Sequence, residues 1–436
     1  MKRGVTGNKR RLWGALTVLL CAALTGCGGA SNPSVSGESG SKEPSHDPVT
    51  LKLYNTQPLN QDDVNLLINE PLKKKYPYIT VEIVDPSNNN TLQNYIASKG
   101  QLDLLTIYNG HIPSYKEMDI FMDITPLAKK NGLDLSRFDP RTLEAMKAIS
   151  DNGELYGIPY NIQFNALYYN KDLFDKFGIA YPQDGMTWED AIELAKKLTR
   201  EESGVQYRGL DPESIIRLMY PLSLNIVDAK TNKTSVNSEP YKKLFDLGYR
   251  IYSIPGNQAG KSSSQDAFMK DRNVAMLATI NLFHSLAKFP DLNWDVAQYP
   301  SYKDNPNIFG MFDMHVLTIL KTSKYPDEAA KVMDVFFSDE VQMLSTKMTG
   351  RVSPLKDPKF NEAFGLDMPI LKGKRIQSIF KSIPAPAPPF SKYYPKARDI
   401  MSDEFKQFLS GGKDMNTALR DAEMRINQYI QGELGQ

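Results

Sequence analysis

The stretch VTLKLYNTQPLNQDDVNLLINEPLKKKYPYITVEIVD, residues 49–85, alternates between two hydrophobic patterns. Its first seven and last seven residues are rich in β-formers, whereas Val64, Leu67 and Ile68 between them have helical spacing. Another short apolar run, DLLTIYN, follows at 103–109. This β-α-β-α order predicts an α/β fold with a mostly parallel sheet covered by helices, in which ligands bind beyond the carboxyl ends of the strands.

Polar and aromatic residues stand at the ends of two of these predicted strands. Asn55 and Gln57 end or follow the first strand, and Tyr108, Asn109 and His111 end or follow the strand at 103–109. Because solutes bind at that edge of such a sheet, these side chains are candidates for a binding site.

Four helices are predicted further along the chain from their caps and apolar stripes. Thr187-Trp188-Glu189-Asp190 resembles a capping box, and Pro326 opens a helix whose apolar residues follow the i, i+3, i+4, i+7 template. Ser338 caps a helix that ends near Gly350, and Asp414 caps the helix nearest the carboxyl end. Their stripes are interpreted as core faces.

Composition excludes several classes of protein. The 436 residues include 52 Lys and Arg against 51 Asp and Glu, a formal charge of +1, and 41% are hydrophobic. This balance gives no sign of nucleic-acid binding, and the length suffices for two domains. Two cysteines are too few for a disulfide-stapled small protein or a multi-cysteine metal site.

The first 26 residues read as an export signal. They carry five basic residues and no acid, and an apolar run of 13 residues, 12–24, is too short to span a bilayer. Leu24-Thr25-Gly26-Cys27 then resembles the lipobox of bacterial lipoproteins, which implies diacylglyceryl transfer to Cys27 and cleavage before it. An ordinary small-residue cleavage site is the alternative. Residues 27–48 read as a flexible tether, and the chain from 27 onward has 47 basic and 51 acidic residues, a charge of −4.

The usual catalytic and metal-binding motifs are missing from the sequence. Gly256 to Ser262 resembles a phosphate-binding loop but has three residues between its glycines where that loop has four. The paired acids at 62–63 and 201–202 could serve a glycosidase, but acids at helix starts are usually solvated. We therefore expect no metal, no cofactor and no enzymatic activity.

The segment DNGELYGIPYNIQFNALYYNKDLFDKFGIAYPQDGMTWEDAIELAKKLT, 151–199, resembles the signature region of family 1 extracellular solute-binding proteins of ABC importers. The likeness rests on the order and spacing of G-x-L-Y-G-I-P-Y, A-L-Y-Y-N-K-D-L-F and T-W-E-D. Further agreement comes from 268–280, 294–300, 320–342 and 411–430, so the resemblance covers nearly the whole body.

The resemblance implies a two-lobe periplasmic-binding-protein-like fold of type II, with three hinge crossings between the lobes. The crossings are expected near 161–166, 278–282 and 310–316. The implied divisions are a lipoprotein signal peptide at 1–26, a lipidated tether at 27–48, one lobe at 49–163 plus 281–312, and the other at 164–280 plus 313–436. Hinge bending would trap the solute between the lobes.

A set of solute contacts follows from this resemblance and from the polar, aromatic chemistry that suits sugars. Its members are Asn55, Gln57, Tyr108, Asn109, His111, Asn165, Asp211, Phe283, Tyr393 and Tyr394. Asn165 falls at a contacting acid of the maltose-type motif, and Phe283 and the Tyr393-Tyr394 pair fall where stacking tryptophans are expected. Core positions are the alternative for Phe283, Tyr108 and Tyr393, and an ordinary surface position for His111.

The resemblance thus implies a lipid-anchored, monomeric receptor on the outer face of the cell membrane that delivers a carbohydrate, an oligosaccharide above all, to an ABC permease. Two alternatives stay open: a cell-surface carbohydrate-active enzyme, and a receptor coupled to a sensor or with no role in transport.

Overall fold

The computed structural model describes residues 47–57, 59–84, 91–97 and 100–435, and Asp47 to Gln436 form one compact unit. The signal, Cys27 and most of the tether lie outside these residues. Among the helices that are described, none combines the length and apolar character needed to cross a bilayer.

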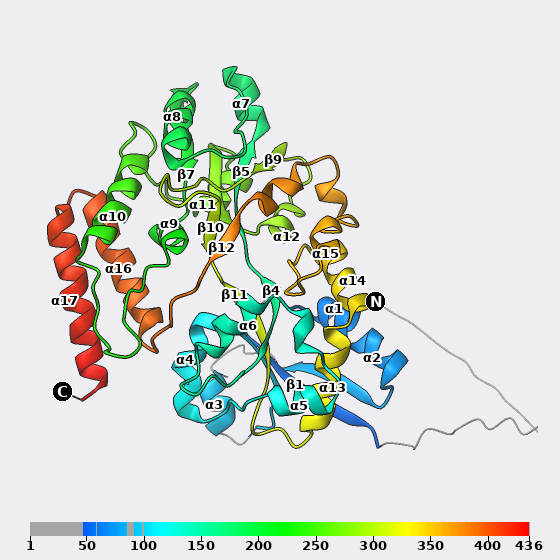
Figure 1. Ribbon diagram of the computed structural model, residues 1–436. Coiled ribbons are helices and arrows are strands. Elements are labelled where there is room, and N and C mark those ends of the chain that lie inside the picture. The colour runs from blue at the N-terminus through cyan, green and yellow to red at the C-terminus, as the bar shows by residue number, and fades with distance from the viewer. Residues whose placement is uncertain (1–46, 58, 85–90, 98–99, 436) are drawn as a thin grey trace, which may run out of the picture. The chain divides into compact units, whose positions relative to one another are not determined.

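Two five-stranded sheets and a short two-stranded one organise this unit (Figure 1). The first sheet has the order β2 (Ile79–Val84), β1 (Val49–Asn55), β3 (Leu104–Tyr108), β11 (Met314–Ile319), β4 (Ile158–Ile162). The second has the order β6 (Arg200–Glu202), β7 (Val205–Asp211), β8 (Val274–Ile280), β5 (Asn165–Asn170), β9 (Trp294–Ala297). The small sheet pairs β10 (Ile308–Met311) with β12 (Ile383–Ala385).

Each large sheet packs against its own helices and its own core. The first core takes side chains from all five strands of its sheet and from helices such as α13. The helices between and after those strands are α1 (Gln61–Val64), α2 (Glu70–Lys75), α3 (Leu92–Ala97), α4 (Ile112–Tyr115), α5 (Thr125–Lys130), α6 (Pro140–Lys147), α13 (Pro326–Phe336) and α14 (Asp339–Thr349). We call this part lobe 1.

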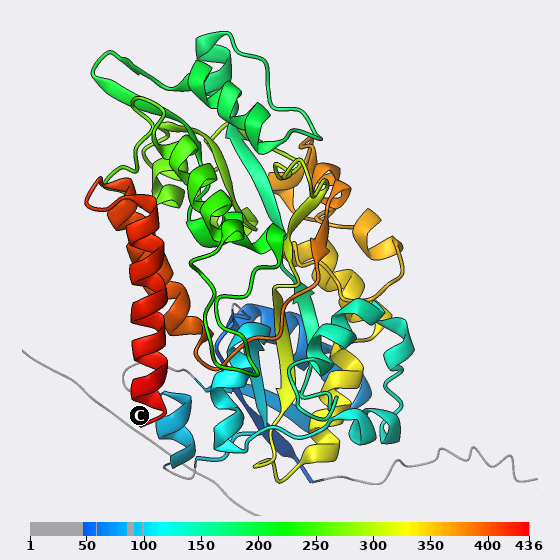
Figure 2. The same ribbon diagram turned by 60° about the vertical axis from the view of Figure 1, so that its left-hand side comes forward.

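The second core unites the other sheet with helices from two distant parts of the chain. They are α7 (Lys171–Phe177), α8 (Trp188–Leu198), α9 (Ile215–Met219), α10 (Glu239–Tyr252), α11 (Ser264–Met269), α12 (Phe283–Leu286), α16 (Tyr394–Leu409) and α17 (Met415–Glu433). Figure 2 shows α17 running alongside α16 at the carboxyl end. We call this part lobe 2; α15 (Lys359–Glu362) lies where the chain passes from lobe 1 to lobe 2.

The structure confirms the predicted helix caps. Thr187 and Asp190 form a reciprocal capping box at the start of α8, and Ser338 accepts a hydrogen bond from the Val341 amide at the start of α14. That helix ends at Gly350, whose φ of 59° is a left-handed conformation that suits glycine. Asp414 caps α17 through the amide of Thr417. Local hydrogen bonding therefore sets these helix ends.

The strand pairing corrects the expected division into lobes. β9 pairs with β5 and so belongs to lobe 2, although 281–312 is expected in lobe 1. β11 pairs antiparallel with both β3 and β4 and so belongs to lobe 1, although 313–436 is expected in lobe 2. The first sheet is therefore parallel among β1, β2 and β3 and antiparallel at β11, because β11 enters the sheet from the other lobe.

The crossings lie where the chain leaves one core for the other. The first is at Gln163, between β4 and β5, and the second is between Met311 and Phe312. The third lies between Phe360 and Phe364. No crossing occurs at 278–282, because β8 continues into α12, which packs in the core of lobe 2.

Candidate functional site

The crossing segments present two chemically different faces. Ile162 and Phe164 line one cavity, whereas the amide of Gln163 between them contacts the His315 ring, with 3.0 Å between Nε2 atoms. Phe312 lines the same cavity, whereas the next residue, Asp313, faces Arg217. Successive side chains of extended backbone point to opposite sides, so the crossings separate an aromatic face from a polar face.

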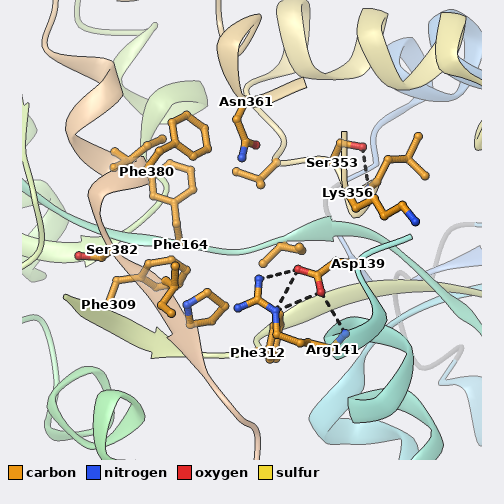
Figure 3. Close-up of a pocket in the computed structure, with 16 residues that line it drawn as sticks. Asp139, Arg141, Phe164, Phe309, Phe312, Ser353, Lys356, Asn361, Phe380 and Ser382 are labelled. Atoms are coloured by element: carbon orange, nitrogen blue, oxygen red, sulfur yellow. Dashed lines mark hydrogen bonds and ion pairs between the residues drawn. The ribbon is translucent and has the colours of Figure 1, made fainter. Parts of the chain in front are cut away.

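The aromatic face lines a cavity beside the crossings, with a volume of about 230 Å³ (Figure 3). Phe164, Phe309 and Phe380 lie on one side of it, and the Asp139–Arg141 ion pair lies toward the other. Arg141 also stands over the Phe312 ring, 5.6 Å from its centre. Among its lining residues, all within the described ranges, no buried side-chain polar atom lacks a partner. The buried polar atoms that line this cavity are therefore already satisfied within the described chain.

The polar face holds a buried network of charges centred on Arg217, from α9. Its Nε lies 3.0 Å from a Glu213 oxygen, and its guanidinium lies 3.7 Å from Asp313, on the second crossing. Gln265 and Thr279 donate further hydrogen bonds to Glu213, at 2.8 and 2.6 Å. The arginine side chain is 18% exposed, so this link between lobe 2 and the crossing is largely shielded from water.

Three tyrosines complete this face. Tyr220, just after α9, lies with its ring centre 5.8 Å from the Arg217 guanidinium, and its hydroxyl is 3.0 Å from that of Tyr394. Tyr108, at the end of β3 in lobe 1, stands beside both, but its buried hydroxyl completes no hydrogen bond of normal geometry to a described residue. We call the six residues Tyr108, Glu213, Arg217, Tyr220, Asp313 and Tyr394 the crossing cluster.

Burial and pairing shift the pKa values of this cluster in opposite directions. Burial raises the pKa of Asp313, against the opposing effect of Arg217 and Arg398. Burial alone would also raise the pKa of Glu213. The charge of Arg217 and the hydrogen bonds that Glu213 accepts outweigh this effect and hold the pKa of the carboxyl below its usual value. Burial and the neighbouring Tyr220 raise the pKa values of Tyr108 and Tyr394 well above the ordinary tyrosine value. Tyr108 and Tyr394 therefore stay neutral hydroxyls, able to donate and accept hydrogen bonds.

The adjoining His315 is a neutral imidazole at physiological pH. Burial, reinforced by Arg351, lowers its pKa to about 3. Asn161 and Gln163 contact its two ring nitrogens at 3.3 and 3.0 Å. The first crossing and β11 are thus joined by polar contacts without an added charge.

Asn109, a predicted solute contact, positions the backbone at Asp313. Its amide donates to the carbonyl of Phe312 and accepts from the amide of Met314, both at 3.0 Å. These two bonds hold the backbone on either side of Asp313. The backbone N–H of Gln163 also donates to the backbone carbonyl of Asp313, at 2.8 Å.

Asp211 has a similar indirect role. Its carboxylate pairs with Arg208 at 2.7 Å, accepts from the Tyr252 hydroxyl at 3.0 Å and accepts from the Glu213 amide at 2.8 Å. Glu213 itself has a φ of 62°, a strained conformation for a residue with a side chain. Asp211 therefore holds the loop that carries Glu213, and its contact with a solute stays a prediction.

Three other predicted contacts also have local partners. The side-chain amide nitrogen of Asn165 donates to the Phe309 carbonyl at 2.8 Å, which fixes β10 against β5. The side-chain oxygen of Asn165 is buried without a partner in the described chain. Asn55 donates to the Leu59 carbonyl at 2.7 Å and accepts from the Thr106 hydroxyl at 2.5 Å. Gln57 is half-buried, and its amide lies 3.4 Å from the Thr56 hydroxyl.

Phe283 lies in the core of lobe 2 and not in the site. It is fully buried, and its ring lies 5.8 to 5.9 Å from those of Phe164, Tyr168 and Trp294. The expectation of a stacking residue here is therefore corrected: the residue after β8 begins α12 and turns into the core.

His111 and Tyr393, also predicted, line a second cavity that both lobes form. The His111 ring lies 5.0 Å from that of Tyr108, and Tyr393 directly precedes Tyr394. Of the ten predicted contacts, Tyr108 and Tyr394 thus belong to the crossing cluster, and His111 and Tyr393 lie beside it. In the described ranges, no group of three or more His, Cys, Asp or Glu side chains could hold a metal ion.

Arg217, Tyr220, Asp313 and Glu213 are absent from the predicted set. A signal existed for Asp313, because it and His315 are the only ionisable residues in the apolar run IFGMFDMHVLTIL, 308–320. For Arg217 and Tyr220 the signal was weaker: both follow the carboxyl end of β7 by a few residues.

Comparison with known proteins identifies the same family that the motifs at 151–199 resemble. The family model described as bacterial extracellular solute-binding protein matches residues 58–343. An ABC substrate-binding protein of Listeria monocytogenes, solved in complex with cycloalternan, has a similar fold, with a TM-score of 0.72 at 22% identity over 88% of this chain and 99% of that one.

Similar sequences point the same way. A putative binding protein of Brucella abortus is 27% identical over 46% of this chain and 50% of its own length, so the match spans about half of that relative. The sn-glycerol-3-phosphate-binding periplasmic protein of Brucella melitensis is 24% identical over 64% of this chain and 68% of its own length.

Proposed function

This chain belongs to the bacterial extracellular solute-binding proteins, a non-enzymatic family, and from that membership we propose that it captures a carbohydrate between its two lobes for delivery to an ABC permease. The observation that carries the proposal is the crossing cluster. Lobe 2 and the second crossing contribute most of its polar side chains, and Tyr108, at the end of β3, comes from lobe 1. A solute bound there touches both lobes and so favours their closed arrangement.

The chemistry of the cluster suits a hydroxylated, uncharged solute. Its carboxylates and arginine offer acceptors and a planar donor fork, and its tyrosines offer rings together with hydroxyls. Arg217 is already paired with Glu213 and Asp313, so its charge is compensated within the cluster. A sugar fits this balance better than an anion does. The cycloalternan bound to the Listeria protein supports the same class of ligand.

A thermal-shift screen tests the proposal. Purified protein is melted with glucose, maltose, maltotriose, mannobiose and sn-glycerol-3-phosphate, each over a concentration series. At a hundredfold excess over Kd, a binding sugar should stabilise the fold by about 2.7 kcal/mol. If only the glycerol phosphate raises the melting temperature, the carbohydrate assignment is wrong.

Transport and sensing use the same capture step, so they need a separate test. Deletion of the gene should abolish uptake of the radiolabelled sugar identified by the screen. Normal uptake together with a lost transcriptional response would favour a receptor coupled to a sensor instead.

The lipid anchor is part of the proposal and rests on Cys27, which lies outside the described residues. A diacylated protein should partition with membranes, because more than one acyl chain gives stable attachment. Cys27→Ala should release the exported protein from membranes, measured by fractionation and blotting of whole cells. A variant that is exported and stays fully membrane-bound would contradict this attachment.

A further inference from the structure

All three crossings contribute side chains to the cavity of about 230 Å³ on their aromatic face, which we call the aromatic cavity (Figure 3). Ile162 and Phe164 flank the first crossing, Phe312 follows the second, and Asn361 lies within the third. We infer that the aromatic cavity is an effector site for a small, uncharged aromatic molecule, whose binding is coupled to the arrangement of the two lobes. No residue of the crossing cluster lines it, so the site is separate from the one proposed for the solute.

Phenylalanine rings from both lobes form much of the wall. Phe164, Phe309 and Phe380 pack with the core of lobe 2, and Phe312 packs with that of lobe 1. Aromatic rings attract one another edge to face or offset, beyond the effect of their buried area. A cavity of about 150 Å³ with apolar walls takes benzene. The aromatic cavity, at about 230 Å³, therefore has room for one ring or two fused rings.

The polar groups around the rings favour an uncharged ligand with a single polar edge. Asp139 and Arg141 neutralise each other in an ion pair at 2.6 Å, and Lys356 is exposed, with its amino end pointing away from the phenylalanines (Figure 3). The buried polar atoms of the lining already have partners within the described ranges, so a sugar would gain few hydrogen bonds there. Asn361 is exposed and points toward the cavity, where its side-chain amide can exchange water for one polar group of a ligand.

The aromatic cavity and the crossing cluster share the backbone of two crossings. Phe312 lines the cavity, and the next residue, Asp313, faces Arg217 in the cluster. At the first crossing, Phe164 lines the cavity and the preceding Gln163 lies on the polar face. Adjacent side chains of extended backbone point to opposite sides. A ligand packed against these two rings therefore also restrains the polar residues beside them.

A bound aromatic molecule should favour the arrangement of the lobes that the structure shows. The two walls belong to different lobes, with Leu355 in the core of lobe 1 and Phe309 in that of lobe 2, so movement of one lobe against the other changes the shape of the cavity. In this same arrangement Arg217 lies 3.7 Å from Asp313, and the crossing cluster is assembled. A ligand that stabilises this arrangement raises the affinity for a solute that also requires it.

Titration calorimetry of indole into purified protein tests the site. Indole should bind with a Kd on the order of 1 mM or lower, as is usual for so small a ligand. Val352→Phe adds a ring at a half-buried position of the lining and should weaken indole binding at least about tenfold, because the added side chain fills the cavity. If this variant does not fold, Asn361→Trp, at an exposed position of the same lining, replaces it with the same expected loss.

The matched control is Val205→Phe. It makes the same change at a residue of β7 that is 41% exposed and does not line the cavity, so indole affinity should equal that of the wild type.

The coupling is measured by repeating the titrations with the sugar that the thermal-shift screen identifies, and this part alone rests on the proposed carbohydrate function. Saturating indole should raise the affinity for the sugar about five- to tenfold, and saturating sugar should raise the affinity for indole by the same factor, because coupling between two sites is reciprocal. In Val352→Phe the sugar affinity should no longer respond to indole.

Failure of indole to bind, or binding that both cavity variants leave unchanged, would overturn the effector site and leave the carbohydrate function standing. Indole binding without any change in sugar affinity would overturn the coupling. If indole binds at the cavity but no sugar binds, the site stands and the proposed function fails. Tighter binding of indole-3-carboxylate than of indole to the wild type, with the gain lost in Lys356→Met, would overturn the assignment to an uncharged ligand.

Discussion

Phe283→Ala should lower the free energy of unfolding by about 3–5 kcal/mol, the usual effect of removing a buried phenylalanine side chain. The ring is fully buried among Phe164, Tyr168 and Trp294, so its removal leaves a cavity that these rigid rings cannot readily fill. The change is measured as the shift in the urea midpoint of purified protein, with the slope of the transition checked for constancy.

Two further variants separate a core role from a binding role. Phe283→Leu should keep the fold and bind sugar with unchanged affinity, whereas a residue that stacks on the solute would lose affinity with little loss of stability. Leu366→Ala, at a site that is 67% exposed, serves as the control and should change stability by less than about 0.5 kcal/mol. A normal urea midpoint for Phe283→Ala would contradict the structure.

Arg217→Met should abolish measurable sugar binding and destabilise the fold by about 3 kcal/mol. The substitution leaves the carboxylates of Glu213 and Asp313 largely buried without their shared cation. Both carboxyls then titrate at higher pH. The folded state of the variant would therefore bind protons more readily than its unfolded state. Its deficit in the free energy of unfolding, relative to wild type, should shrink as the pH falls from 7 to 5.

Arg250→Met is the matched control, because its ion pair with Glu189 is exposed and should contribute less than about 1 kcal/mol. Arg217→Lys keeps the charge but loses the planar fork, so we expect stability closer to wild type and an affinity loss of roughly tenfold or more. Retention of full sugar affinity by Arg217→Met would show that the solute binds elsewhere.

Local chemistry made part of the fold predictable. The helix caps and helix ends at Thr187, Ser338, Gly350 and Asp414 are formed by side chains and backbone within one turn, so neighbouring residues suffice to identify them. The strands at 49–55, 79–84 and 104–108 were recognisable for the same reason, because each carries its own apolar pattern.

The division into lobes needed information that no local pattern holds. β11 inserts between β3 and β4, about 200 residues after the first of them, and β9 pairs with β5 more than 120 residues earlier. Either strand is apolar enough for either sheet, so hydrophobicity alone does not say which partner it takes. Only pairing in three dimensions assigns 281–311 to lobe 2 and the segment from Phe312 to Phe360 to lobe 1.

The sequence by itself determined that this is an α/β protein of the solute-binding family, because the helix and strand patterns and the motifs at 151–199 are properties of adjacent residues. The tertiary structure alone decided which side chains meet at the crossings. Asn109 is bound by the backbone at Phe312 and Met314, more than 200 residues further along the chain, and Arg217 and Asp313, nearly 100 residues apart, come together in a buried polar network. Such a network depends on the packing of one lobe against the other, because a charge is stabilised away from water only where a distant segment supplies its partner.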